Sequence, residues 1–266
     1  MSEEQSKPLA AFLAILPIGL LLMVDFFIES LQLAEKLIPH LAFGVLLAQL
    51  LCLVAFIKGE ICPGQRGRLI KANVCFALYW FVWLGMSLAS PHHYVMTDIV
   101  SLCGLSAVYA VWKQPKDEVA RRGFLLMASL VSGFGVIAYL IIFFGNPTPN
   151  FVQYNPFAQA VMGVLLANLC LSVSRNRLQG FIALLPLLMI LLLAINALAV
   201  LIFIIYQGTS AVVFSNVFAY GIYFLLHLVI AGVLLLHSVK KWKLSYNSLL
   251  ILFFMAASLP VWAMFI

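Results

Sequence analysis

Charged residues are scarce in this chain. Asp, Glu, Lys and Arg make up 9% of its 266 residues, and 65% are hydrophobic, whereas a soluble domain carries about a quarter charged residues. So little polar surface cannot cover a water-soluble globule, and most of the exterior must face lipid. The net charge of +6 does not indicate a nucleic-acid partner, because the basic residues lie in short segments between apolar runs. The composition predicts an integral membrane protein that contacts the bilayer and no nucleic acid.

The usual signatures of metal, cofactor and disulfide sites are missing as well. The five cysteines show no C-x-x-C spacing, which argues against a zinc ribbon or a disulfide framework. Four of them lie in apolar segments, where a cysteine behaves as a small hydrophobe. No Walker motif, dinucleotide-binding fingerprint or EF-hand loop occurs. We therefore predict no bound cofactor and no catalytic residue.

Long apolar runs dominate the chain instead. A bilayer core of about 30 Å needs about 20 apolar residues per helix. Nine stretches reach or approach that length: 9–29, 39–58, 72–90, 94–112, 123–145, 157–174, 179–206, 212–237 and 246–265. Ser129 and Gly133 lie four residues apart in the fifth stretch, a spacing that predicts a close helix contact. We predict an all-α fold: one transmembrane domain, 1–266, that is a bundle of nine membrane-spanning helices.

Basic residues separate to one side of these spans. With the N-terminus in the cytoplasm, fourteen of the 15 Lys and Arg fall in cytoplasmic segments, and Lys36 alone falls outside. Cytoplasmic loops carry such an excess, and one span more or fewer would scramble it. The acidic start MSEEQSK lacks the basic region of a signal peptide, so we expect the first helix to be retained. The pattern predicts a cytoplasmic N-terminus, an external C-terminus and a multi-pass location in a bacterial inner membrane.

Two proline-bearing segments are similar. Residues 12–17 read FLAILP and residues 181–186 read FIALLP, and both open helices that are predicted to run in the same direction. Parallel repeats occur in transporter folds. The match suggests a weak duplication of spans 1–3 (9–90) and spans 7–9 (179–265).

Ionisable residues within or beside the spans gather near the outer surface. An ionisable group inside a span is costly and is a functional hypothesis by default. Asp25 lies in the outer half of the first span with Glu29 one turn further on the same face, and Asp98 enters the fourth span from outside. Histidines open the second and fourth spans on the same side. The outer set is Asp25, Glu29, His40, His92, His93 and Asp98.

This set is compatible with three chemistries. Carboxylates and histidines pass protons in a coupled transporter, because imidazole titrates near neutral pH. Imidazole and carboxylate also bind divalent metals, with His40, His92, His93 and Asp98 as the candidate ligands. Two aspartates can form an acid–base pair for intramembrane proteolysis, although neither has a recognisable flanking motif. The plain structural alternative is that these groups contact water or cap a helix end.

Four polar residues lie deeper in the membrane. They are Gln49, Asn168, Asn196 and His227. Interhelical hydrogen bonds account for such residues at modest energy, about 0.6 kcal/mol each. The functional alternative is a polar path that continues inward from Asp25, Glu29 and Asp98.

Three classes of function fit this pattern. The first, our working hypothesis, is a transporter or permease for a small solute or ion, with Asp98 and Asp25 as proton carriers tuned by the outer histidines. The second is a non-catalytic accessory or assembly subunit, which would bind a membrane-protein partner. The third is a membrane-embedded metal-handling protein or enzyme. The lack of a catalytic motif favours a protein that is not an enzyme.

Overall fold

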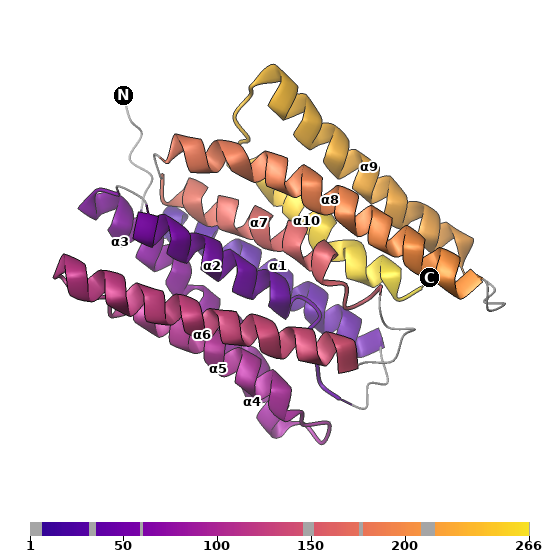
Figure 1. Ribbon diagram of the computed structural model, residues 1–266, viewed down its shortest axis with the longest axis horizontal. Coiled ribbons are helices and arrows are strands. Elements are labelled where there is room, and N and C mark those ends of the chain that lie inside the picture. Colours follow the sequence, from indigo (N-terminus) through magenta and orange to yellow (C-terminus); the bar gives the residue numbers. More distant parts are fainter. Residues whose placement is uncertain are drawn as a thin grey trace.

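The described part of the chain folds into helices alone. The computed structural model describes residues 7–31, 36–58, 61–145, 152–175, 178–208 and 216–265. These residues contain no β-strand and form α1 (Lys7–Leu31), α2 (Ala42–Lys58), α3 (Pro63–Val74), α4 (Phe76–Ala89), α5 (Val95–Trp112), α6 (Glu118–Gly145), α7 (Pro156–Val173), α8 (Gln179–Gly208), α9 (Val217–Lys240) and α10 (Tyr246–Ala263) (Figure 1). The predicted all-α fold is confirmed.

Nine membrane crossings fit these helices. Eight stretches of the described chain are long and apolar enough to cross a bilayer, and α2, with 17 residues, is a shorter apolar helix. Helices α3 and α4 form one of the eight stretches, Pro63–Ala89. They meet at Cys75, whose backbone stays in the right-handed helical region. The predicted number of spans therefore agrees with the structure.

Two helices begin away from the approximate span boundaries predicted from the sequence. The span predicted at 72–90 belongs to a helical stretch that begins at Pro63, because hydropathy marks only the apolar part and the helix continues beyond it. Helix α2 begins at Ala42 and not at residue 39, since residues 37–39 are not helical. They are tied to the α4–α5 turn: the Leu37 N–H donates to His92 O at 2.9 Å, and Thr97 Oγ1 donates to Leu37 O at 2.7 Å. The span predicted at 212–237 corresponds to α9. The first residues of that predicted span lie outside the described part of the chain.

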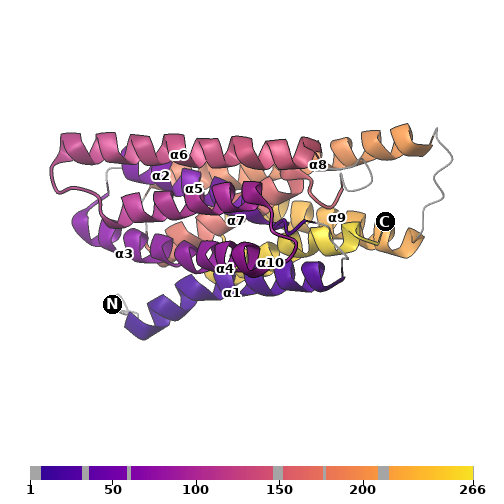
Figure 2. The ribbon, with the colours of Figure 1, turned by 90° about the horizontal axis from the view of Figure 1, so that it is seen from below.

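Helix α1 begins and helix α10 ends at opposite ends of the bundle, as an odd number of crossings requires (Figure 2). One end collects the first residues of α1, α3, α6, α8 and α10 and the last residues of α2, α5, α7 and α9. We call it the basic end, and the other the outer end. The basic residues on the segments that meet at the basic end are Lys58, Arg66, Arg68, Lys71, Lys113, Lys116, Arg121, Arg122, Arg175, Lys240, Lys241 and Lys243. Lys36 lies at the outer end.

Helix α7 lies at the centre of the bundle. It packs against α1, α2, α3, α8 and α10, and 89% of its residues are buried. Its closest neighbour is α2, because Gly44 and Gly163 face each other without side chains. A Cβ on Gly44 would lie 2.5 Å from Gln159 O, and one on Gly163 would lie 3.0 Å from Gly44 Cα. Small residues thus let the two backbones approach closely, as is usual between membrane helices.

The end of α7 is capped by side chains of α3. Arg68 Nε donates to Ser174 O at 3.0 Å, and Gln65 Nε2 donates to Arg175 O at 3.1 Å. Arg175 itself has a positive φ of 52°. A cation that donates to carbonyls at a helix C-terminus satisfies them and complements the helix dipole. The polar first turns of α3 therefore fix the central helix at the basic end.

The two segments suggested as repeats pack differently. In the C-terminal segment α9 contacts both α8 and α10, whereas α2 of the N-terminal segment makes its largest contacts with α6 and α7. Buried side chains from both segments belong to one continuous core. The duplication of 9–90 and 179–265 stays a prediction.

Candidate functional site

Asp25 is buried between α1 and α4 in the outer half of the bundle. Its side chain is 0% exposed, and Tyr79 Oη donates a 2.6 Å hydrogen bond to its Oδ2. Asp25 Oδ1 has no hydrogen-bond partner. Trp83 Nε1 and the main-chain N–H groups of His40 and Leu41 lie near enough to act on the charge. Among the described residues no Lys or Arg pairs with this carboxylate, so neutral donors alone stabilise it.

His40 is a buried histidine beside this carboxylate. Its ring is stacked on Tyr154, with 4.4 Å between the ring centroids and 19° between the planes. The side chain is 0% exposed, and in the described structure neither ring nitrogen has a hydrogen-bond partner. Burial without a partner disfavours a charged imidazolium. Because neither nitrogen is hydrogen-bonded, packing positions the ring. Two hydrogen-bonding nitrogens are thus left available inside the protein.

Glu29 extends the acidic group toward the outer end. It lies one turn beyond Asp25 on α1, is half-buried, and has one oxygen, Oε2, without a partner. The charge of His92 acts on it. Tyr154, in the loop before α7, lies near both acids: burial, and then the charges of Glu29 and Asp25, raise the pKa of its hydroxyl above the ordinary value. His92 and Glu29, and Tyr154 with Glu29 and Asp25, are therefore near enough to interact electrostatically.

Asp98 and His93 form an ion pair at the outer end of α5. The Nε2 to Oδ2 distance is 2.6 Å, and the side chains are 41% exposed for His93 and 15% for Asp98. An exposed pair of this kind contributes about 0–1 kcal/mol to stability. Asp98 is thus part of the surface rim, whereas Asp25 is inside the bundle.

The four candidate metal ligands are not brought together. His40 is stacked on Tyr154, while His93 is engaged with Asp98. Over the described ranges no three or more His, Cys, Asp or Glu side chains are grouped closely enough to hold a metal ion. A site of this kind needs at least three protein ligands around one point, so the described geometry gives a metal centre no support.

A second buried network joins α7, α8 and α9. Asn155 Nδ2 donates to Asn196 Oδ1 at 2.6 Å, and Asn196 Nδ2 contacts both Tyr223 Oη, at 3.0 Å, and His227 Nε2. His227 Nδ1 lies 2.8 Å from Tyr223 O, so Nδ1 carries the proton and Nε2 accepts from the amide. Asn196 and His227, both predicted path residues, therefore meet, but Asn168 is not in this network.

Gln49 and Gln159 form further buried hydrogen bonds between helices. Gln49 accepts from Trp80 Nε1 at 3.0 Å and donates to Gly104 O at 3.1 Å. Gln159 accepts from the Phe43 N–H at 3.0 Å and donates to Tyr139 Oη. Each amide thus crosslinks helices that are far apart in sequence. Gln49 has the structural role of an interhelical bridge.

A family model described as an integral membrane domain matches residues 4–265 of this chain. The chain belongs to this family. An uncharacterized protein of Haemophilus influenzae is 57% identical over 267 residues, and the alignment covers 100% of both chains. No solved structure matches. As a member of the integral membrane domain family the protein is multi-pass and contacts the lipid bilayer, and it has a bacterial relative.

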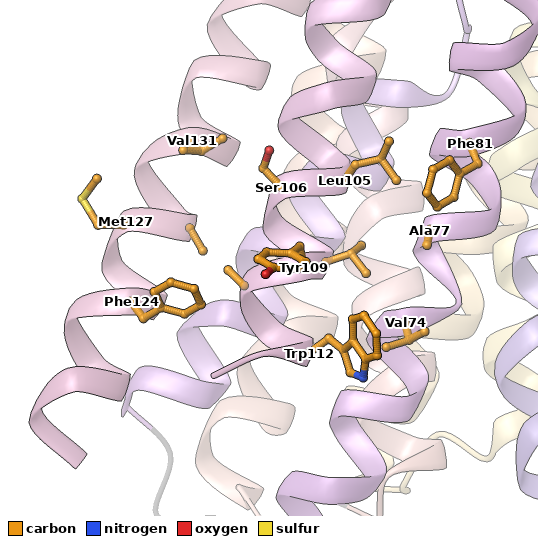
Figure 3. A pocket seen from close by; sticks show the side chains of 13 residues that line it. Val74, Ala77, Phe81, Leu105, Ser106, Tyr109, Trp112, Phe124, Met127 and Val131 are labelled. Atoms are coloured by element: carbon orange, nitrogen blue, oxygen red, sulfur yellow. The ribbon is translucent and has the colours of Figure 1, made fainter. Parts of the chain in front are cut away.

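One large groove of this integral membrane domain faces lipid. It has a volume of about 670 Å³ and is lined by α4, α5 and α6, with Phe81, Tyr109, Trp112 and Phe124 among its walls (Figure 3). The Ser106 hydroxyl donates to Leu102 O within the same helix, and Tyr109 and Trp112 add a hydroxyl and an indole N–H to the lining (Figure 3). The other lining side chains are apolar, so the groove offers a hydrophilic solute few hydrogen bonds.

The tyrosines of the site were missed by sequence reasoning. Tyr79 bonds to Asp25, and the charges of Glu29 and Asp25 act on Tyr154, but an aromatic residue in or near an apolar run gives no signal of its own. The one available cue is the run Tyr79-Trp80-Phe81-Val82-Trp83, in which three side chains able to donate hydrogen bonds lie within five residues. Such donors need partners when buried, and α1 supplies the one that Tyr79 uses.

Proposed function

We propose that this protein is a transporter or permease for a small solute or ion, that it lies in the inner membrane of a bacterium, and that Asp25 is its proton carrier. The observation that carries the proposal is a fully buried carboxylate held by neutral donors with one oxygen unpaired. A buried charge with no cation beside it is costly. A site that only stabilises the fold gains little from such a group, whereas a proton carrier requires one.

The neighbours of Asp25 supply a route for the proton. His92 and Glu29 lie toward the outer surface, and Tyr154 lies near both acids. Adjacent turns of α1 separate the side chains of Glu29 and Asp25 by about 6 Å, a distance that one water or one hydroxyl bridges. Asp98, which the sequence also suggested as a proton carrier, would act together with His93 as an entry group at the rim.

The second network offers a place for the solute. Asn155, Asn196, Tyr223 and His227 present amide, hydroxyl and imidazole groups in the interior between α7, α8 and α9. Amides, hydroxyls and imidazole recognise polar solutes by hydrogen bonds. We assign this network to the solute path and Asp25 to the proton path.

Vesicles test the proposal. The full chain is reconstituted with a trapped pH-sensitive dye, a pH gradient is imposed, and a panel of amino acids, carboxylates, nucleosides and monovalent cations is added in turn. We expect a member of the panel to collapse the gradient in wild-type vesicles. Asp25→Asn should abolish that response, and Asp25→Glu should retain part of it. Asp98 is the matched carboxylate at the rim. Asp98→Asn should slow the response and leave solute uptake coupled to proton movement.

A substrate-independent measurement accompanies this assay. Infrared difference spectra across a pH step should contain the carbonyl stretch of a protonated carboxyl group, and Asp25→Asn should remove that band. Full coupled uptake by Asp25→Asn vesicles would overturn the proposal. So would the absence of a response to every solute in a protein that inserts and melts normally.

A further inference from the structure

A cavity of about 610 Å³ lies at the basic end, between α7, α8, α9 and the segment that joins α9 to α10. Helices α8 and α9 diverge toward this end (Figure 1), and residues of α7 and of the α9–α10 connection complete the lining. Its volume is in the range of cavities that bind small molecules, about 300–1,000 Å³. None of its walls comes from α1 or α4, so it is separate from the Asp25 site.

The mouth of this cavity is basic. Arg175, His237, Lys241 and Lys243 contribute to the lining, and no acidic side chain does. His237 Nδ1 donates to Val233 O, which leaves Nε2 for another partner. Clustered basic groups at this depth, between membrane helices on the basic side, recognise the phosphate of a lipid headgroup.

Inside the cavity a polar side chain has no partner. Asn168 lines the space and is 4% exposed. Within the described part of the chain its side-chain amide makes no hydrogen bond, although nearly every other buried amide in the bundle does. A ligand oxygen in the cavity would satisfy it.

The cavity opens sideways to the membrane as well as to water. Leu187 lines it and is also 56% exposed on the lipid-facing side of α8. Leu171, Ile182 and Pro186 continue the apolar wall inward. Trp242 lies at the mouth and is 58% exposed, in the manner of aromatic residues at the headgroup level. A ligand with a charged head and an apolar tail matches both parts of the lining.

We propose that this cavity binds an anionic phospholipid from the leaflet at the basic end. The phosphate lies between Lys241, Lys243 and His237, the Asn168 amide donates to an oxygen of the glycerol region, and an acyl chain leaves between α8 and α9 along Leu187. This binding does not depend on transport and would persist in a protein whose Asp25 was inert.

Native mass spectrometry of the full chain tests the site. The purified protein is offered equal amounts of dioleoyl phosphatidylglycerol and dioleoyl phosphatidylcholine, and retained lipid is counted. We expect wild type to retain phosphatidylglycerol preferentially. In the double variant Lys241→Gln/Lys243→Gln the preference for phosphatidylglycerol should fall about fivefold for each lysine removed. Ala183→Trp, which fills the cavity from α8 without changing charge, should abolish it.

Controls separate this site from general charge attraction. Lys113→Gln/Lys116→Gln removes two exposed lysines at the same end that do not line the cavity, and it should keep the preference. Thermal melting in phosphatidylcholine should be the same for all variants. An equal loss in the Lys113/Lys116 control, an unaffected Ala183→Trp variant, or displacement of the lipid by millimolar inorganic phosphate would overturn the proposal.

Discussion

Tyr79 Oη lies 2.6 Å from Asp25 Oδ2 and donates a hydrogen bond to it, which links the first turn of α4 to α1. Both side chains are 0% exposed. A second tyrosine also bonds to α1: Tyr246 Oη of α10 donates to Leu13 O at 2.7 Å. The two bonds differ in their acceptors, because one is a carboxylate and the other a main-chain carbonyl. This difference makes them a matched pair for measurement.

Tyr79→Phe should cost more stability than Tyr246→Phe. Hydrogen bonds to charged groups are the stronger class, and interhelical bonds in membranes average about 0.6 kcal/mol with a maximum near 1.7. We expect losses of about 1.5 kcal/mol for Tyr79→Phe and about 0.6 kcal/mol for Tyr246→Phe. Reversible unfolding in mixed detergent and SDS measures both. Equal losses would mean that Asp25 carries no charge for Tyr79 to stabilise.

Asn196 should be far more important for stability than Asn168. Asn196 bonds to Asn155, Tyr223 and His227, so Asn196→Ala leaves three polar groups unpaired and should cost about 2 kcal/mol. Asn168 has no partner among the described residues, so Asn168→Ala should change the free energy of unfolding by no more than about 0.5 kcal/mol. The same SDS titration compares them. A larger loss at Asn168 would contradict the assigned hydrogen bonds.

The number of spans could be predicted from sequence, whereas the inward faces of the helices could not. Span number follows from run length and from the separation of fourteen basic residues from Lys36, and both are properties of the chain alone. The inward face is different, because lipid is as apolar as leucine and does not select which side turns to the core. Tyr79 is 0% exposed and Tyr109 is 56% exposed, yet both lie in equally apolar stretches.

The same limit explains an error in α6. The spacing of Ser129 and Gly133 predicted a helix contact there, but a Cβ on Gly133 would have nothing within 4 Å. The contact lies two residues further on, where a Cβ on Gly135 would be 2.9 Å from Cys103 Cβ. Two residues correspond to about 200° around a helix, so the chosen pair faces away from the true contact. The pairing of Asp25 with Tyr79 could not be predicted for the same reason, because it depends on which faces of α1 and α4 turn toward each other.

Gly163→Ala should destabilise the bundle at its centre. A methyl group there would meet the backbone of α2, with Gly44 Cα at 3.0 Å, and neither backbone can move without repacking. Overpacking of this kind costs about 1–3 kcal/mol. Gly133→Ala is the matched control and should be neutral or stabilising, because the position is open and alanine favours the helix. A neutral Gly163→Ala would mean that α2 and α7 are further apart than described.

Cys62 provides a test of which end of the bundle faces the cytoplasm. It lies next to α3 at the basic end and is the exposed member of the five cysteines, whereas Cys52 and Cys170 are buried and Cys75 and Cys103 are intermediate. Because cytoplasmic segments carry the excess of basic residues, a membrane-impermeant maleimide should leave Cys62 unmodified in intact cells and modify it in inverted vesicles. Cys62→Ser should remove that signal. Modification in intact cells would reverse the orientation, and the route through His92 and Glu29 would then begin in the cytoplasm.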